Sequence, residues 1–142
     1  MQWVTEKTTL PRMWVLRNPR LWKLFFRAKK PWLELHLKST PGEHLTKEEY
    51  RFALRTYVNE ARRKGYEGLF CASWFMDSAV SEISPRLGFL REDAQTFGAK
   101  VFSVHRLCKS QMLDATKTSP TRRSAFHHGE YEPKVHCMVL PV

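Results

Sequence analysis

A glutamate and a histidine two residues apart form the clearest candidate for acid–base chemistry. Glu34 and His36 lie in residues 33–38, LELHLK, where apolar and polar residues alternate. Successive side chains of a strand point to opposite faces, so Glu34 and His36 share one face and the leucines share the other. A carboxylate beside an imidazole can orient the ring while it takes up a proton. The pair is therefore a candidate general base, although a surface histidine on a half-exposed strand is commoner.

A second group of candidate side chains follows an apolar run. Residues 68–75, GLFCASWF, predict a buried strand that feeds a helix. Ligands of α/β sheets gather at the carboxyl ends of strands, which makes Ser73, Trp74 and Asp77 candidate substrate-binding residues. Each also has a plainer interpretation, since tryptophan is usually a core residue and an Asp directly before a helix usually caps it.

The positive charge of the chain is concentrated near its N-terminus. Residues 1–32 hold eight Lys or Arg against one Glu, so they carry +7 of the net +10 and leave +3 for residues 33–142. Such a field attracts nucleic acid, an anionic membrane surface or a phosphate-bearing cofactor, or it only solvates the surface.

Asn18 and Pro19 form a helix-start pair, and bulky apolar residues and cations follow at helical spacing. We expect a short basic amphipathic helix, whose apolar stripe packs on the core or meets a partner. If it binds nucleic acid or phosphate, the candidate contacts are Arg20, Lys23, Arg27, Lys29 and Lys30.

Composition narrows the remaining classes. A chain of 142 residues with 42% hydrophobic content suits one globular domain. The cysteines Cys71, Cys108 and Cys137 are widely spaced, so we expect no metal site and reduced, mostly buried thiols in a cytoplasmic protein. No apolar run approaches the ~20 residues of a membrane span, and no signal-peptide core is present.

The most secure element is a helix over residues 46–64. Thr46 and Glu49 form a capping box, apolar residues recur at helical spacing, and Gly65 ends the helix. A two-part helix is expected to begin at Asp77 or Ser78 and to restart at Ser84. Further helices are expected to begin near residue 109 and at Ser119. Strands are expected at residues 33–38, 68–75, 100–107 and 135–140. The predicted fold is α/β (or α+β), a mixed sheet flanked by helices, with a basic arm over 1–32 and the domain over 33–142.

Three of these features together resemble a known family. The strand LELHL, the segment CASWFMD before a helix, and one capped helix between them are similar to the C-terminal domain of the GNAT-like acyltransferases found in bacteria. That family carries the signature C-H-S-W-L-L-D-P, whose histidine falls on Ala72 and whose proline falls on Ser78. The resemblance covers residues 33–102.

The resemblance implies a GNAT-like mixed sheet and transfer of an acyl group from acyl-coenzyme A to an amine. It places Glu34 or His36 as the base, Ser73 and Trp74 in the acyl or acceptor pocket, and Asp77 at the acceptor amine or as a helix cap. Fewer strands than a complete acyltransferase sheet leave an edge to cover, which a second copy or a protein partner can do.

Two other functions fit the sequence. A non-catalytic protein with the same fold can bind nucleic acid through the basic arm, because cations interleave there with aromatic residues. An accessory protein can use the same aromatics to bind a protein partner.

A salt titration tests the nucleic-acid hypothesis. If the arm tracks a phosphate backbone, log Kd changes steeply with log salt, by about 0.7 to 0.9 for each neutralised phosphate. Replacing Arg20, Lys23 and Arg27 together by Gln is expected to flatten this dependence, as measured by fluorescence anisotropy. Weak binding that is the same in the triple variant contradicts the hypothesis.

Overall fold

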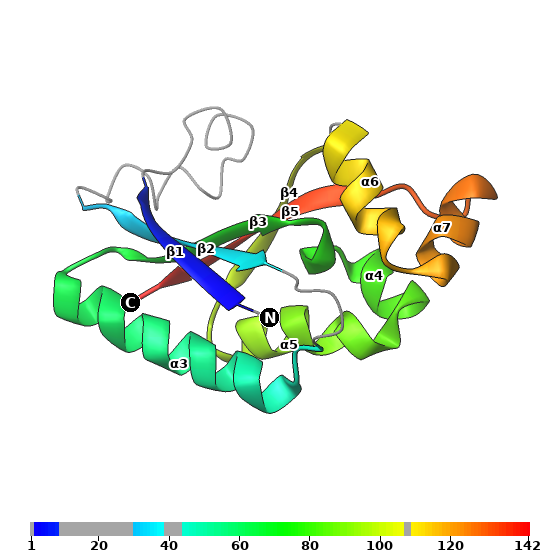
Figure 1. Ribbon diagram of the computed structural model, residues 1–142. Coiled ribbons are helices and arrows are strands. Elements are labelled where there is room, and N and C mark those ends of the chain that lie inside the picture. The colour runs from blue at the N-terminus through cyan, green and yellow to red at the C-terminus, as the bar shows by residue number, and fades with distance from the viewer. Residues whose placement is uncertain (1, 9–29, 39–43, 107–108) are drawn as a thin grey trace.

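A mixed β-sheet forms the centre of the molecule. The structure, a computed structural model, describes residues 2–8, 30–38, 44–106 and 109–142. Within these residues the sheet has five strands in the order β1-β2-β3-β5-β4 (Figure 1). Their bounds are β1 Gln2–Thr8, β2 Trp32–Lys38, β3 Gly68–Ser73, β4 Lys100–Arg106 and β5 Lys134–Pro141. Among the described strands, β2 and β3 are the only hydrogen-bonded neighbours that pair in parallel, and β5 is inserted between β3 and β4.

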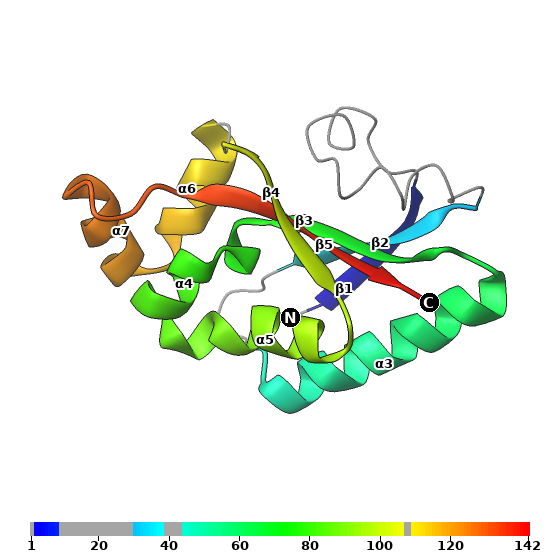
Figure 2. The ribbon, with the colours of Figure 1, turned by 180° about the vertical axis from the view of Figure 1, so that it is seen from behind.

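Helices cover both faces of this sheet. The longest is α3 Lys47–Lys64, and the others are α4 Ser78–Ile83, α5 Gly88–Thr96, α6 Lys109–Lys117 and α7 Pro120–His127. Short 3-10 helices, η1 Trp74–Met76 and η2 Pro85–Leu87, connect β3, α4 and α5. Figures 1 and 2 show α3 and α5 running beneath the sheet, with α6 and α7 at the end of the molecule where β3 terminates.

The apolar residues of the strands divide into two packed faces. On the α3 face, the sheet side chains Leu33, Leu69 and Met138 pack against α3 and α5. On the opposite, α6 face, Phe70 and Val139 pack against Ala115 and Met112 of α6. Both faces of the central strands are therefore buried, which explains why β3 begins with a continuous apolar run.

The predicted helix over 46–64 is confirmed in detail. The Thr46 hydroxyl accepts from the backbone amide of Glu49 at 3.2 Å, and the Thr46 amide donates to the Glu49 carboxylate at 2.8 Å. Gly65 ends the helix with φ 67°, a left-handed conformation that glycine adopts without strain. Tyr50 and Leu54 are buried against the sheet.

The four predicted strands lie in one sheet, as expected. The bounds differ by one residue at the start of β2, at the end of β4 and at both ends of β5, and by two residues in β3, which ends at Ser73 and not at Phe75. The Ser73 hydroxyl accepts from the Phe75 amide at 3.4 Å and turns the chain into η1. β1 is a strand within the segment predicted as a basic arm, so the sheet begins inside that segment. The basic helix expected after Asn18 lies outside the described residues.

The expected break in the helix after Asp77 is present. Ser84, before Pro85, has φ −132° and ψ 73°, since a residue before proline avoids the helical region. Helix starts are also confirmed at Ser119 and near residue 109. In β4 the alternation is interrupted by an irregularity between Ser103 and His105.

Two of the three cysteines are described. Cys71 and Cys137 are buried and free, and Cys108 lies outside the described residues. No helix in the described ranges combines the length and the apolar character that crossing a membrane requires.

Truncating a buried residue of α3 tests its packing. Leu54→Ala is expected to lower the free energy of unfolding by about 2 to 5 kcal/mol, through lost burial and a residual cavity. Phe52→Ala, on the same helix, is the control, because Phe52 is 72% exposed and its loss should change stability little. Urea denaturation measures both, and equal effects would show that the α3 face is wrongly assigned.

Candidate functional site

The parallel strands β2 and β3 are paired along only part of their length. Their ladder contains Leu33 opposite Leu69 and Glu34 opposite Phe70, whereas β1 and β2 pair through seven positions. Beyond Glu34 and Phe70 the two strands are not paired with each other, and their carboxyl ends diverge (Figure 1). The carboxyl ends of parallel strands are where α/β sheets bind ligands. We call this place the β2–β3 opening.

Glu34 and His36 lie on β2 beside this opening. Glu34 Oε1 is 3.4 Å from His36 Nε2, so the predicted pairing of the two side chains is confirmed. Their side chains are 21% and 45% exposed, which leaves the imidazole accessible to a bound molecule. Both project toward the α6 face, since Leu33 and Leu35 on the same strand point into the α3 face.

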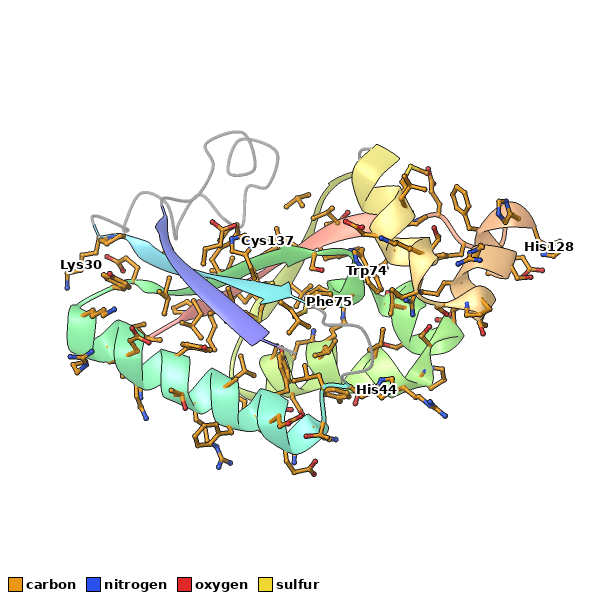
Figure 3. All side chains as sticks on the ribbon, in the orientation of Figure 1. Lys30, His44, Trp74, Phe75, His128 and Cys137 are labelled. Carbon is orange, nitrogen blue, oxygen red and sulfur yellow. The ribbon has the colours of Figure 1, made fainter. Side chains whose placement is uncertain are left out.

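Ser73 and Trp74 stand at the end of β3. Figure 3 shows Trp74 and Phe75 together there, and their rings meet edge to face at 5.8 Å. Trp74 is partly buried against the α6 face and against Val80 and Ala125, so it packs as a core residue. Of the two, Ser73 has the better position to meet a ligand.

Asp77 caps α4. Its Oδ1 accepts from the backbone amide of Ala79 at 3.2 Å, and the residue is 6% exposed. The capping role that the sequence suggested is therefore present. The same oxygen lies 4.0 Å from Nδ1 of His136, a residue that sequence reasoning did not single out.

His136 reaches Asp77 because β5 is inserted next to β3. The ladder places it opposite Ser73 on one side and opposite Ser103 on the other. Its Nδ1 is buried and has no hydrogen-bond partner among the described residues. Burial lowers the pKa of His136, an effect that Arg91 and Lys134 strengthen and that Asp77 and a backbone hydrogen bond with Lys134 oppose. The imidazole is therefore neutral at neutral pH.

Sequence reasoning also missed two buried polar residues, Arg122 of α7 and Tyr131 between α7 and β5. Arg122 is 5% exposed, donates to the carbonyl of Ala115 at 2.6 Å and to Ser84 Oγ at 2.8 Å, and stacks on Trp74 at 4.6 Å. The Tyr131 hydroxyl is buried without a hydrogen-bond partner in the described ranges. Burial, assisted by the charge of Asp77, raises its pKa to about 12. Arg122 thus fixes α7 to α4 and α6 by hydrogen bonds.

The other candidate groups are not brought together with this site. Lys30 is exposed before β2, far from Trp74 (Figure 3), and Arg20, Lys23, Arg27 and Lys29 lie outside the described residues. Burial raises the pKa of Cys71 to about 12, so its thiol is a poor nucleophile. Among the described side chains, no group of three or more His, Cys, Asp or Glu could hold a metal ion.

The N-terminus of α3 follows β2 in the chain, but its first turn does not favour binding of a phosphate group. Glu48 and Glu49 occupy its first turn, and Glu49 already bonds to the capping residue Thr46. Anions bind at helix starts through free amides and the positive end of the helix dipole. In α3 the Glu49 carboxylate already accepts from the Thr46 amide, and Glu48 and Glu49 place negative charge at the positive end of the helix dipole.

Comparisons with known proteins give no relative. No protein-family model, no curated protein and no solved structure matches the chain. The chemistry of the site is therefore inferred from its geometry.

The buried imidazole of His136 predicts a dependence of stability on pH. Its pKa is lowered in the folded state, so the unfolded state binds more protons once the pH falls below about 6.5. The free energy of unfolding should therefore decrease as the pH falls from 7.5 to 5.5.

Replacing His136 by Gln should reduce this decrease, and His128→Gln, an exposed histidine at the end of α7, is the matched control. Urea denaturation at pH 7.5 and pH 5.5 measures the loss of unfolding free energy in each variant. A His136→Gln variant that loses as much stability as the parent would contradict the assignment.

Proposed function

We propose that the chain is a GNAT-like N-acyltransferase that moves an acyl group from an acyl-coenzyme A thioester to an amine. The observation that carries this proposal is the β2–β3 opening, a parallel strand pair joined by α3 and paired through only two positions. Its support is geometric, together with the resemblance of residues 33–102 to that family.

The opening offers what the donor needs. The arm of coenzyme A that carries the thioester contains amide groups. Such an arm can hydrogen-bond to unpaired strand edges as an added strand does. Past Glu34 and Phe70 the facing edges of β2 and β3 do not pair with each other, so their amides and carbonyls can turn to a ligand. An amide at this edge can also stabilise the oxyanion that forms when the amine attacks.

Glu34 and His36 supply the proton acceptor in this proposal. The amine must lose a proton as its nitrogen bonds to the thioester carbonyl, and an imidazole held by a carboxylate can take it. The pair lies on β2, 3.4 Å apart and partly exposed, at the start of the opening. Ser73 borders the opening from β3, and Asp77 serves as the cap of α4.

Kinetics of the two β2 variants test the base. Glu34→Gln and His36→Ala are expected to lower the rate of acyl transfer by about 10² to 10⁴ without unfolding the protein. Transfer from acetyl-coenzyme A to a panel of primary amines is followed by release of the free thiol over a range of pH. Glu82→Gln and His127→Ala, which are exposed on α4 and α7, serve as controls.

Donor binding is tested separately from turnover. Acetyl-coenzyme A should raise the melting temperature, since a ligand that binds only the folded state stabilises it. Wild-type rates in both β2 variants would remove Glu34 and His36 from the mechanism. Absence of both binding and turnover would refute the transferase and favour a non-catalytic binding protein.

A further inference from the structure

The buried apolar cluster on the α6 face has a partly exposed boundary. The cluster includes Phe70 and Cys137. Within the described ranges, the partly buried apolar side chains that pack against it are Ala72, Trp74 and Met112. The first two lie at the carboxyl end of β3 and the start of η1, and the third belongs to α6, which contacts η1. Apolar surface is therefore reachable where β3 ends, which is also where the β2–β3 opening lies.

Ala72 lies across this opening from His36. The strands β2 and β3 run parallel, and Glu34 is opposite Phe70 in their ladder. His36 and Ala72 each stand two residues further along their strands, so they share the face of that pair. The strands no longer pair there, which makes their separation wider than the ~4.8 Å between paired neighbours. A group held beside His36 therefore has the small methyl side chain of Ala72 as its neighbour on β3.

Trp74 closes this surface at a fixed position. The guanidinium of Arg122 stacks on its ring at 4.6 Å, and it also donates to the Ala115 carbonyl and to Ser84 Oγ. Because Ala115 belongs to α6, these contacts hold Trp74 and α6 in one relation. A ring held in this way limits how far a bound chain can extend, whereas the unbranched side chain of Met112 can adapt to it.

The character of this surface selects a class of acyl group. A hydrocarbon chain gains free energy when it covers the apolar side chains of the boundary. A chain that ends in a carboxylate would lose hydration there and would meet the carboxylate of Glu34, which lies 3.4 Å from His36 on the same face. The surface therefore favours a short, uncharged acyl chain.

We propose that the donor carries a short apolar acyl group, which lies over Ala72 and whose length is limited by Trp74 and Met112. This inference rests on the proposed transferase function and names the substrate class of that same site. The acyl carbonyl stays beside His36 on the α6 face, where the amine attacks it directly. Ala72 is then a specificity-determining residue, because a larger side chain would occupy the place of the acyl chain.

A series of donors tests the acyl class. The full chain is assayed with acetyl-, butyryl-, octanoyl- and succinyl-coenzyme A and a panel of primary amines, and release of the free thiol gives kcat/KM. Exclusion of a single methylene from an apolar site changes kcat/KM by about 10- to 200-fold. The parent protein should therefore use the acetyl and butyryl donors, and use octanoyl and succinyl at least about tenfold less well.

Two variants should change the chain-length preference in opposite directions. Ala72→Leu should lower the ratio of butyryl to acetyl kcat/KM at least about tenfold, because the leucine fills the place of the longer chain. Met112→Ala should raise the ratio of octanoyl to acetyl kcat/KM by a similar factor. Leu113→Ala is the matched control, since Leu113 lies on the same helix, is 66% exposed and should leave both ratios unchanged. Circular dichroism checks folding, and either variant tests the inference if the other does not fold.

Donor binding provides a readout that does not need turnover. Butyryl-coenzyme A should raise the melting temperature of the parent protein more than coenzyme A does, because its acyl chain adds contacts in the folded state alone. This difference should be absent in Ala72→Leu.

The outcomes separate the acyl site from the transferase. Transfer whose chain-length ratios neither variant alters, or succinyl as the best donor, overturns the acyl site and leaves the transferase standing. A butyryl-specific rise in melting temperature that Ala72→Leu abolishes, without transfer to any amine tested, supports the acyl site and removes the transferase. Equal melting temperatures with every donor and with coenzyme A, together with no transfer, refute both.

Discussion

The sheet depends on the two ladders of β5. This strand pairs antiparallel with β3 on one side and with β4 on the other, and Cys137, Met138, Val139 and Leu140 are buried in succession. Both edges and both faces of β5 are therefore in contact with the rest of the protein, which is the condition under which a continuous apolar strand is stable. Without β5, β4 would lose its neighbour within the described sheet, and β3 would keep only its short ladder with β2.

The same arrangement determines where the sheet can open. At their amino ends β2 and β3 lie close together, since a Cβ on Gly68 would be only 2.8 Å from the ring of Trp32. The amide of Glu67 also donates to the carbonyl of Pro31 at 2.9 Å. The strands are therefore fixed at one end and divergent at the other. In the sequence, this geometry corresponds to Gly68 where the strands are close and to Glu34 and His36 where they diverge.

Local signals predicted most of the fold, and the site only in part. Thr46, Gly65 and Ser119 mark helix ends through their own backbone interactions, so a single sequence locates them. Glu34 and His36 are neighbours on one strand, and alternation alone predicts that they share a face. His136 is different, because its contacts with Ser73 and Asp77 exist only once β5 lies beside β3. No sequence period reveals which strand is inserted in the middle. Arg122 and Tyr131 were missed because their burial depends on the packing of α4 against α7, which is also not visible in a local pattern.

The position of β5 also has a consequence for how the protein is made. A ribosome releases β3, α4, α5, β4, α6 and α7 before it releases β5. Until then β3 and β4 lack the strand that later pairs with both of them. During that interval the apolar side chains Phe70 and Phe102, which are later buried on the same face, lack Val135, Cys137 and Val139 of β5 to pack against. Unpaired edges and exposed aromatic residues are what chaperones and aggregating chains recognise. Nascent chains that stall before residue 134 would present both, and the pairing of β5 with β3 and β4 covers these strand edges.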